Sequence, residues 1–300
     1  MNLTNLKYVQ YELIDGGTIA RITLARPEKR NAQNRGLLVE LDELFVEAEQ
    51  DDNVRVVILR GAGPIFSAGH DMGSAEHLAE RAVGSSQHPT MQINGGTRDG
   101  AEKRMLQEWH YFFENTRRWR DLRKITIAEV NGDVYAAGLM LVWACDLIVA
   151  ERNALFADVV GTRLGMCGVE YFGHPWEFGP RRAKELLLTG DAISAEEAHS
   201  LGMVSRLYAR EDLAEGVLAL ARKIVRLPTV TALLIKEAVN QSQDAMGFQS
   251  ALRSAFMIHQ LNHSHWAEVT NGDRISAPPG VSVHSWSDAP DLQRSRTERA

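Results

Sequence analysis

Short apolar runs alternate along the chain with stretches that repeat apolar residues at helical spacing. Ile19–Leu24 is rich in β-branched and aliphatic side chains and stops before a proline, which predicts a strand. Over residues 37–48, apolar positions recur every three or four residues opposite acidic ones, which predicts an amphipathic helix. Further strands are predicted at 54–59 and Ile65–Ser67. This order of strand, helix and strand indicates a parallel α/β architecture.

The same unit recurs in the middle of the chain. Ile125–Val130 predicts a strand, an Asn-Gly pair turns the chain, residues 139–144 predict an apolar helix, and residues 146–150 predict another strand. The recurrence of a strand-strand-helix unit suggests a stacked spiral. Between Asp71 and Trp109 the pattern fades, and turn formers predict a long, partly mobile loop. Helical spacing returns at about 101–122, with aromatic residues that suit a pocket wall or a plain core helix.

We expect three parts along the chain. Residues 1–210 form the α/β core, and residues 211–276 form a helical region that is broken at Pro228. Residues 277–300 are rich in proline, serine and charge and are expected to be extended or disordered. Near the end of the core, Ser194 and Glu197 form a capping box, and Gly202 follows where a helix end needs a left-handed residue.

Composition narrows the function classes. The 300 residues are 44% hydrophobic and 24% charged, enough for a sizeable core, and the net charge is −6. Net acidity argues against nucleic-acid binding, although the basic stretch at 117–124 around Trp119 leaves RNA as a remote alternative. No apolar run has membrane-spanning length and no signal-peptide pattern is visible, so we expect a cytoplasmic protein without a membrane anchor.

Cysteines and histidines give no sequence signal for a cofactor. Cys145 and Cys167 lie among apolar neighbours without a CxxC pattern and are expected to be buried free thiols. His259 and His263 are four residues apart on a predicted helix, which is ligand-like spacing, but no cysteine or close carboxylate completes a zinc set. These two and His265 are expected to be solvated or to line a cavity. We therefore expect no metal and no cofactor.

Two stretches place small residues at the ends of predicted strands, where backbone amides are accessible. In residues 66–71 (FSAGHD), the N–H of His70 can face a cavity. In residues 135–138 (YAAG), the N–H of Ala137 lies at the start of a predicted helix, whose positive end favours an anion. Two donors aimed at one point would stabilise a carbonyl that becomes an enolate. Each stretch alone is equally compatible with a tight turn packed for steric reasons.

Together with other motifs, these stretches resemble the crotonase family, also called the enoyl-CoA hydratase/isomerase superfamily. The other motifs are RPEKRNA at 26–32, VNG at 130–132, CD at 145–146, LLTGD at 187–191, ISAEEA at 193–198, GMVS at 202–205 and KEAVN at 236–240. The resemblance covers about residues 8–268, and the ordered set is specific although each piece alone is weak. It implies a crotonase-like spiral of ββα units and a C-terminal helical region that builds trimers, commonly paired into hexamers.

The resemblance also implies an acyl-CoA thioester as the substrate. The thioester oxygen would accept hydrogen bonds from the amides of His70 and Ala137, and the acyl group would contact the loop at 74–104 and the aromatic helix after it. The residues expected to contact CoA are Arg30, Ala32, Ala68 and Asp71.

The sequence departs from the family where hydratases carry two glutamates. The aligned positions hold Met140 and Val160, and the later position that some isomerases use holds Gly168. None of these side chains can transfer a proton. Asp158 and Glu170 lie two residues from the expected positions and are candidate replacements, although a solvated or ion-paired role is the alternative for each. Glu177 is a more distant candidate.

We therefore expect an enzyme that stabilises a thioester enolate, most simply an enoyl-CoA hydratase. A histidine at the oxyanion position, as at His70, resembles the decarboxylases of the family. Decarboxylation or isomerisation of another acyl-CoA therefore stays open. A protein that binds acyl-CoA without catalysis, or a scaffold, is the alternative outside the enzyme class.

Overall fold

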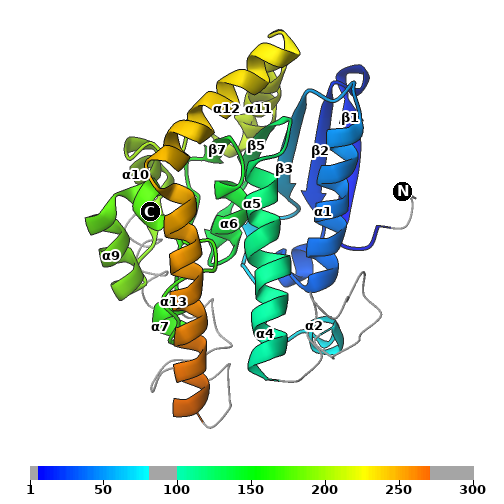
Figure 1. Cartoon of the computed structure of the whole chain (residues 1–300). Coiled ribbons are helices and arrows are strands. Elements are labelled where there is room, and N and C mark those ends of the chain that lie inside the picture. The colour runs from blue at the N-terminus through cyan, green and yellow to red at the C-terminus, as the bar shows by residue number, and fades with distance from the viewer. Residues whose placement is uncertain (1–5, 81–99, 271–300) are drawn as a thin grey trace.

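The computed structural model describes residues 6–80 and 100–270, in which helices surround two sheets (Figure 1). The larger sheet runs in the order β1 (Val9–Ile14), β2 (Ile19–Leu24), β3 (Val56–Gly61), β5 (Ile125–Val130), β7 (Leu147–Glu151) and β10 (Arg206–Tyr208), and only the β1–β2 pair is antiparallel. The smaller sheet runs β4 (Ile65–Ser67), β6 (Asp133–Tyr135), β8 (Leu155–Ala157) and β9 (Ile193–Ser194), with β9 antiparallel.

The chain winds as a spiral because consecutive strands enter different sheets. The pairs β3–β4, β5–β6 and β7–β8 each contribute one strand to the larger sheet and the next to the smaller sheet. Helix α6 (Gly138–Trp143) follows β6, and helix α7 (Val160–Leu164) follows β8. The predicted α/β class and ββα recurrence are confirmed. Since β4 and β6 are parallel neighbours, their carboxyl ends lie side by side, which brings residues 67–71 next to residues 135–137.

Apolar side chains cover both faces of the larger sheet. On one face, Ile58 and Ile127 pack against Val217 of α11 (Arg210–Val225). On the other face, the helix predicted at 37–48 is α1 (Arg35–Gln50), whose first turn is capped by Asn34 through a bond from the Leu37 N–H. This packing buries the apolar stripe of each helix and both faces of the sheet, which stabilises the sheet that carries the site.

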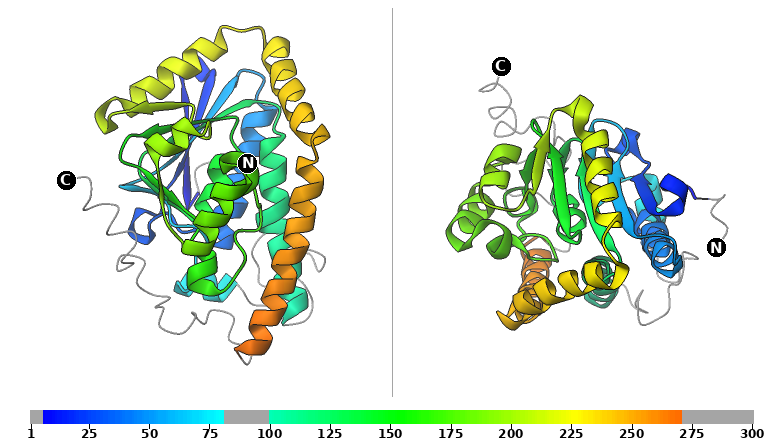
Figure 2. Two further views of the ribbon diagram at one scale, coloured as in Figure 1. Left: turned by 90° about the vertical axis from the view of Figure 1, so that its left-hand side faces the viewer. Right: turned by 90° about the horizontal axis from the view of Figure 1, so that it is seen from above.

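The C-terminal part is helical with a break at Pro228, as predicted, but over residues 210–269 it consists of three helices: α11, α12 (Thr229–Ala245) and α13 (Phe248–Val269). The chain breaks at Pro228, and again at Gly247, whose φ of 98° favours glycine. Figure 2 shows α12 and α13 running along the outside of the sheets. Large apolar side chains on these two helices are more than 45% exposed: Val230, Leu234, Ile235, Val239, Met257, Ile258, Leu261 and Val269.

The predicted loop was wrong in part, whereas the helix predicted at about 101–122 is confirmed. Part of the expected loop is helix α2 (Ala75–Glu80), while residues 81–99 and the tail at 277–300 lie outside the described residues. The helix expected at 101–122 consists of α4 (Ala101–Gln107), the π-helix η4 (Glu108–Glu114) and α5 (Asn115–Arg120). Remaining elements are η2 (Asp15–Gly17), η3 (Pro27–Lys29), α8 (His174–Phe178), α9 (Pro180–Thr189) and α10 (Ala195–Ser200).

The short helix predicted from the capping box is α10. The Ser194 hydroxyl accepts a hydrogen bond from the Glu197 N–H at 3.1 Å, and Gly202 has a φ of 90°. Within residues 6–80 and 100–270, no helix combines the length and the apolar character needed to cross a membrane.

Candidate active site

A pocket opens where β4 and β6 end, and its walls come from distant parts of the chain. His70 and Ala137 lie in its lining with Phe112 of η4, Val160 of α7 and His259 of α13. Helix α13 runs beside the helix formed by α4, η4 and α5, so the two helices close one side of the pocket (Figure 1).

The two predicted amides both belong to this pocket. Gln33 donates its N–H to the Gly69 carbonyl and accepts the N–H of Asp71, each at 2.8–3.0 Å. In an extended strand alternate amides point to opposite sides, so the N–H of His70 is directed away from Gln33. In the part of the chain that the structure describes, neither this N–H nor that of Ala137 donates to a protein carbonyl. Both amides are therefore available to a ligand.

Glycines let the two stretches approach this closely. A methyl group on Gly69, which has a φ of 88°, would lie 2.9 Å from the Ala137 nitrogen. A methyl group on Gly138 would lie 2.7 Å from the Ser67 carbonyl oxygen. Ala136 has a φ of 47°, which is rare for a residue with a side chain and is stored strain of the kind found at functional sites. Larger residues at these positions would force the two stretches apart, which explains the small residues in both motifs.

The RPEKRNA loop at residues 26–32 holds the end of β4 in place through hydrogen bonds. The buried Asn31 amide donates to the carbonyls of Ala62, Ile65 and Phe66 at 2.8–3.1 Å. The Ser67 hydroxyl donates to the Asn31 carbonyl at 2.9 Å. These bonds fix the end of β4, so the position of the His70 amide is determined by the fold itself.

The residues expected to contact CoA gather around the same loop. Ala68 lines the pocket, and its N–H donates to the Arg30 carbonyl at 2.9 Å. Arg30 is exposed, while Ala32 is half-buried and its carbonyl accepts a hydrogen bond from the Arg26 guanidinium. The structure therefore brings these residues together, and their contacts with CoA stay a prediction.

Asp71 has a structural function in this loop. It forms a buried ion pair with Arg26 at 2.9 Å, and both side chains are at most 6% exposed. Its carboxylate also accepts hydrogen bonds from the Ser74 N–H and hydroxyl. Burial alone would raise the pKa of Asp71, but the bonds from Ser74 and Arg26 outweigh this effect and lower it.

The positions of the family glutamates differ in their surroundings. Val160 and Gly168 line the pocket, whereas Met140 is buried in the core and is not among the lining residues. Asp158 does not line it either: its carboxylate accepts the N–H groups of Val160 and Val169 at 3.0 Å. The same carboxylate bonds to the His174 ring at 2.9 Å. This geometry makes Asp158 a support of the loop, and an acid–base role for it stays a prediction that the contacts do not favour.

Glu170, the other candidate, faces the pocket. Its Oε2 lies 3.1 Å from the Nε2 of His70, whose ring stacks on Phe112 with centroids 3.7 Å apart. Burial alone would raise the pKa of Glu170, but this pKa lies well below its ordinary value, chiefly because of the neighbouring His70 ring and its hydrogen bond to the carboxylate. A carboxylate oxygen only accepts, so the hydrogen of this bond belongs to His70 Nε2. Nδ1 of His70 is buried and has no hydrogen-bond partner.

The remaining sequence candidates lie outside this geometry. Glu177 is half-buried away from the pocket lining, and burial raises its pKa to about 7. Cys145 and Cys167 are free thiols, and burial raises the pKa of Cys145 to about 12, which fits the expected unreactive role. In the basic stretch, Arg118 pairs with Asp42 and Arg120 with Asp244, so these charges are used within the fold.

The histidine pair on α13 has a carboxylate beside it, contrary to the sequence argument. Glu108 of η4 lies 3.4 Å from His263 and 3.8 Å from His259, measured from carboxylate oxygens to Nε2 atoms. The sequence could not place it because the two helices meet only through tertiary packing. The four-residue histidine spacing was the available signal, and the expectation that no carboxylate is close was wrong.

Comparisons with known proteins show the family of the chain. The family model for enoyl-CoA hydratase/isomerase matches residues 15–271. The chain belongs to the enoyl-CoA hydratase/isomerase family. Mycobacterium tuberculosis EchA13, which carries the name of an enoyl-CoA hydratase, is 60% identical over 293 residues, which cover 98% of this chain and 92% of that protein. The resemblance to this family that the sequence motifs indicated is therefore confirmed.

Other members show how widely the fold is used. The 1,2-epoxyphenylacetyl-CoA isomerase of Escherichia coli K12 is 32% identical over 228 residues, covering 75% of this chain and 79% of that protein. The crystal structure of a probable enoyl-CoA hydratase from Mycobacterium smegmatis is 41% identical and has a TM-score of 0.77, covering 88% of this chain and 97% of that chain. Membership therefore supports acyl-CoA chemistry without fixing one reaction.

Proposed function

We propose that this enzyme binds an acyl-CoA and stabilises its thioester enolate, and that hydration of a 2-enoyl-CoA is its reaction. The observation that carries the proposal is the pair of available amides, His70 and Ala137, in one pocket. Two fixed donors on a developing oxyanion act without reorganisation, and loss of one typically lowers the rate ~10²–10³-fold. The enoyl-CoA hydratase names among the relatives support the same choice.

The His70–Glu170 pair supplies the proton transfer that Met140 and Val160 cannot. Glu170 holds the His70 ring with its hydrogen on Nε2, which leaves Nδ1 to exchange a proton, as a carboxylate does in a catalytic triad. In hydration, Nδ1 accepts a proton from water, the water oxygen bonds to Cβ, and the double-bond electrons move to the thioester oxygen. The enolate then collapses and takes the proton from Nδ1 at Cα.

The first test separates the two contributions of His70. His70→Ala removes the ring but keeps the main-chain N–H, so we expect kcat to fall about 10²–10⁴-fold while CoA-ester binding is retained. Hydration is followed by loss of the absorbance of the conjugated thioester, and binding by calorimetry. Glu170 is the positioning residue, so Glu170→Gln should lower kcat less than His70→Ala does and should change the pH profile of kcat. An unchanged kcat in His70→Ala would refute the pair, and no turnover of any 2-enoyl-CoA would refute hydration.

Isomerisation or decarboxylation is the second candidate, favoured because the positions of the two family glutamates hold Met140 and Val160, while His70 pairs with Glu170 in the pocket. Isomerisation needs a single base that moves a proton along the acyl chain, and loss of CO₂ forms the enolate without a base. Release of CO₂ from a malonyl-type thioester, or migration of a double bond without water addition, would identify them. Binding without turnover of any thioester would indicate a non-catalytic protein.

We also propose a homotrimer, or a dimer of trimers, in the cytoplasm, with Arg30, Ala32 and Ala68 near the CoA. The exposed apolar side chains of α12 and α13 support the assembly, since a face of this kind is usually covered by another chain. Native mass spectrometry of the full chain would give one mass at three or six copies.

A further inference from the structure

His259 on α13 is buried in a way that leaves one ring nitrogen unused. Its Nδ1 lies 2.9 Å from the Gly168 carbonyl, which can only accept, so Nδ1 carries the hydrogen and Nε2 presents a lone pair. The side chain is 3% exposed, and Nε2 has no hydrogen-bond partner. A buried polar atom without a partner is unfavourable, typically by about 1–3 kcal/mol, so this nitrogen requires an explanation.

Nε2 of His259 is directed at other potential ligands. It lies 3.8 Å from Oε2 of Glu108 and 3.7 Å from Oε1 of Glu170, too far for hydrogen bonds. Oε1 of Glu108 lies 3.4 Å from Nε2 of His263. One ligand atom from each of Glu108, His259 and His263 falls within 4.8 Å of the other two.

These separations are compatible with a metal ion between the three side chains. Zinc lies about 2.0–2.2 Å from nitrogen and carboxylate ligands, so the edges of its tetrahedron measure about 3.3–3.6 Å. The distances of 3.4 Å, from Oε1 of Glu108 to His263, and 3.8 Å, from Oε2 of Glu108 to His259, are close to those edges, each for one carboxylate oxygen. Outer partners are also present: the Gly168 carbonyl orients His259, and the Gln260 amide donates to Glu108 at 2.6 Å.

We propose that Glu108, His259 and His263 bind a divalent transition-metal ion, with zinc as the first candidate. Two imidazoles and one carboxylate suit zinc, whereas magnesium and calcium prefer oxygen ligands alone. All three residues line the pocket that contains the oxyanion amides, so the remaining coordination position is open to the acyl group or to Glu170. The site would add a Lewis acid beside the position where family hydratases use glutamate.

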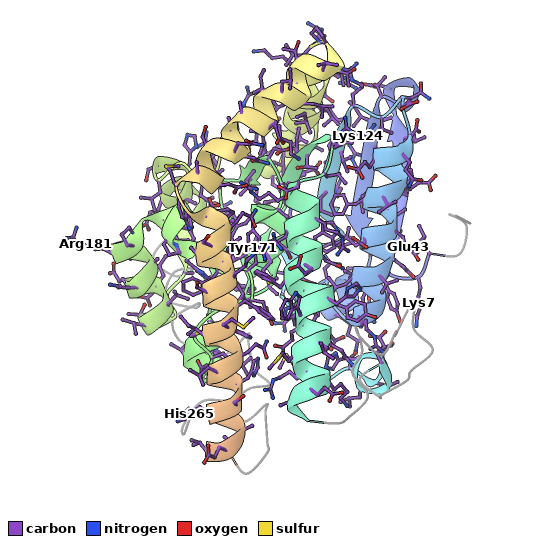
Figure 3. The ribbon with its side chains drawn as sticks, viewed as in Figure 1. Lys7, Glu43, Lys124, Tyr171, Arg181 and His265 are labelled. Carbon is purple, nitrogen blue, oxygen red and sulfur yellow. The ribbon has the colours of Figure 1, made fainter. Side chains whose placement is uncertain are left out.

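The test measures binding of zinc alone and needs no substrate. The full chain is stripped with a chelator, titrated with ZnCl₂ by calorimetry, and analysed for metal content by mass spectrometry. We expect one zinc per chain, at least about tenfold weaker affinity in His259→Ala, His263→Ala and Glu108→Gln, and no saturable binding of magnesium. The matched control is His265→Ala on the same helix, because His265 is exposed near the C-terminal end of α13 (Figure 3) and should leave affinity unchanged.

Several outcomes overturn the proposal. It fails if wild-type protein shows no saturable zinc binding, or if affinity is the same in His259→Ala, His263→Ala and Glu108→Gln as in the wild type. An equal loss in His265→Ala would indicate adventitious binding to surface histidines. Glu108→Gln keeps the size of the side chain, so it stays informative if a histidine variant fails to fold. Zinc binding and enoyl-CoA turnover are separate readouts, so either can fail alone.

Discussion

Replacement of Gly69 by alanine tests whether the close approach of the two amide-bearing stretches creates the site. The new methyl group would stand 2.9 Å from the Ala137 nitrogen, the Tyr135 carbonyl oxygen and the Ala136 Cβ. Real Cβ atoms do not come so close to backbone, so the two stretches must separate. Since Ala137 supplies one of the two proposed oxyanion donors, its amide would move away from the thioester oxygen.

The size of the effect follows from two contributions. An alanine at a φ of 88° costs roughly 1–2 kcal/mol relative to glycine. Insertion of a methyl group into packed backbone costs typically about 1–3 kcal/mol. We expect the free energy of unfolding to fall by about 2–5 kcal/mol, and kcat to fall ~10²–10³-fold because one donor is displaced.

The assays are urea unfolding and the rate of enoyl-CoA hydration at saturating substrate. Gly202→Ala is the matched control, because Gly202 has a φ of 90° and no atom within 4 Å of an added methyl group. It should lose only the stability that belongs to backbone strain, and its kcat should stay near that of the wild type. If Gly69→Ala retains the wild-type kcat while folded, or is no less stable than Gly202→Ala, the steric argument for the oxyanion pair is refuted.

Two further predictions concern buried charges. Asp71→Ala leaves Arg26 buried without its partner, so the free energy of unfolding measured with urea should fall by about 3–5 kcal/mol. The control is Asp15→Ala, which removes one partner of an exposed ion pair and should lower this free energy much less. Equal losses in the two variants would contradict the structural role of Asp71. Glu177 has a pKa raised to about 7 by burial, so its ionisation destabilises the fold as pH rises from about 4.5 to 7. Glu177→Gln should therefore raise the free energy of unfolding, and with it Tm, more at pH 8 than at pH 5. The difference between the two gains in free energy should be on the order of 2–3 kcal/mol. An equal gain at both pH values would contradict the raised pKa of Glu177.

Local periodicity was enough to predict the elements that carry the site. The patterns of β2 and α1 match their burial, β5 is buried at every position after the first, and the amide-bearing stretches follow directly from strand ends and small residues. The parallel β4–β6 pairing then makes their proximity a consequence of topology. Backbone features of this kind are accessible from sequence because they depend on residue size and position.

Side-chain chemistry was less predictable for two physical reasons. The helical period of 3.6 residues cannot reveal η4, where the wider π-helical turn changes which residues share a face, so Glu108 could not be placed beside α13. In the loop before Glu170, Gly165 and Gly168 adopt φ values of 69° and 134°. These turns decide that Glu170 faces the pocket while Asp158 supports the loop, and sequence distance alone could not distinguish them.

The proposed oxyanion amides and the proposed proton-transfer side chains are held in place by different means. Strand pairing and the Asn31 hydrogen bonds hold the oxyanion amides, so side-chain changes at positions 140 and 160 leave those amides in place. The ring of His70, the proposed acid–base group, is instead held by a side chain: Glu170, on the loop that contains Gly165 and Gly168, lies 3.1 Å from its Nε2, and a carboxylate on such a loop can change position without altering the sheets. If the amides act as proposed, a fold built in this way can exchange its proton-transfer groups and keep enolate stabilisation, which is consistent with its use by relatives named for hydration and for epoxide isomerisation.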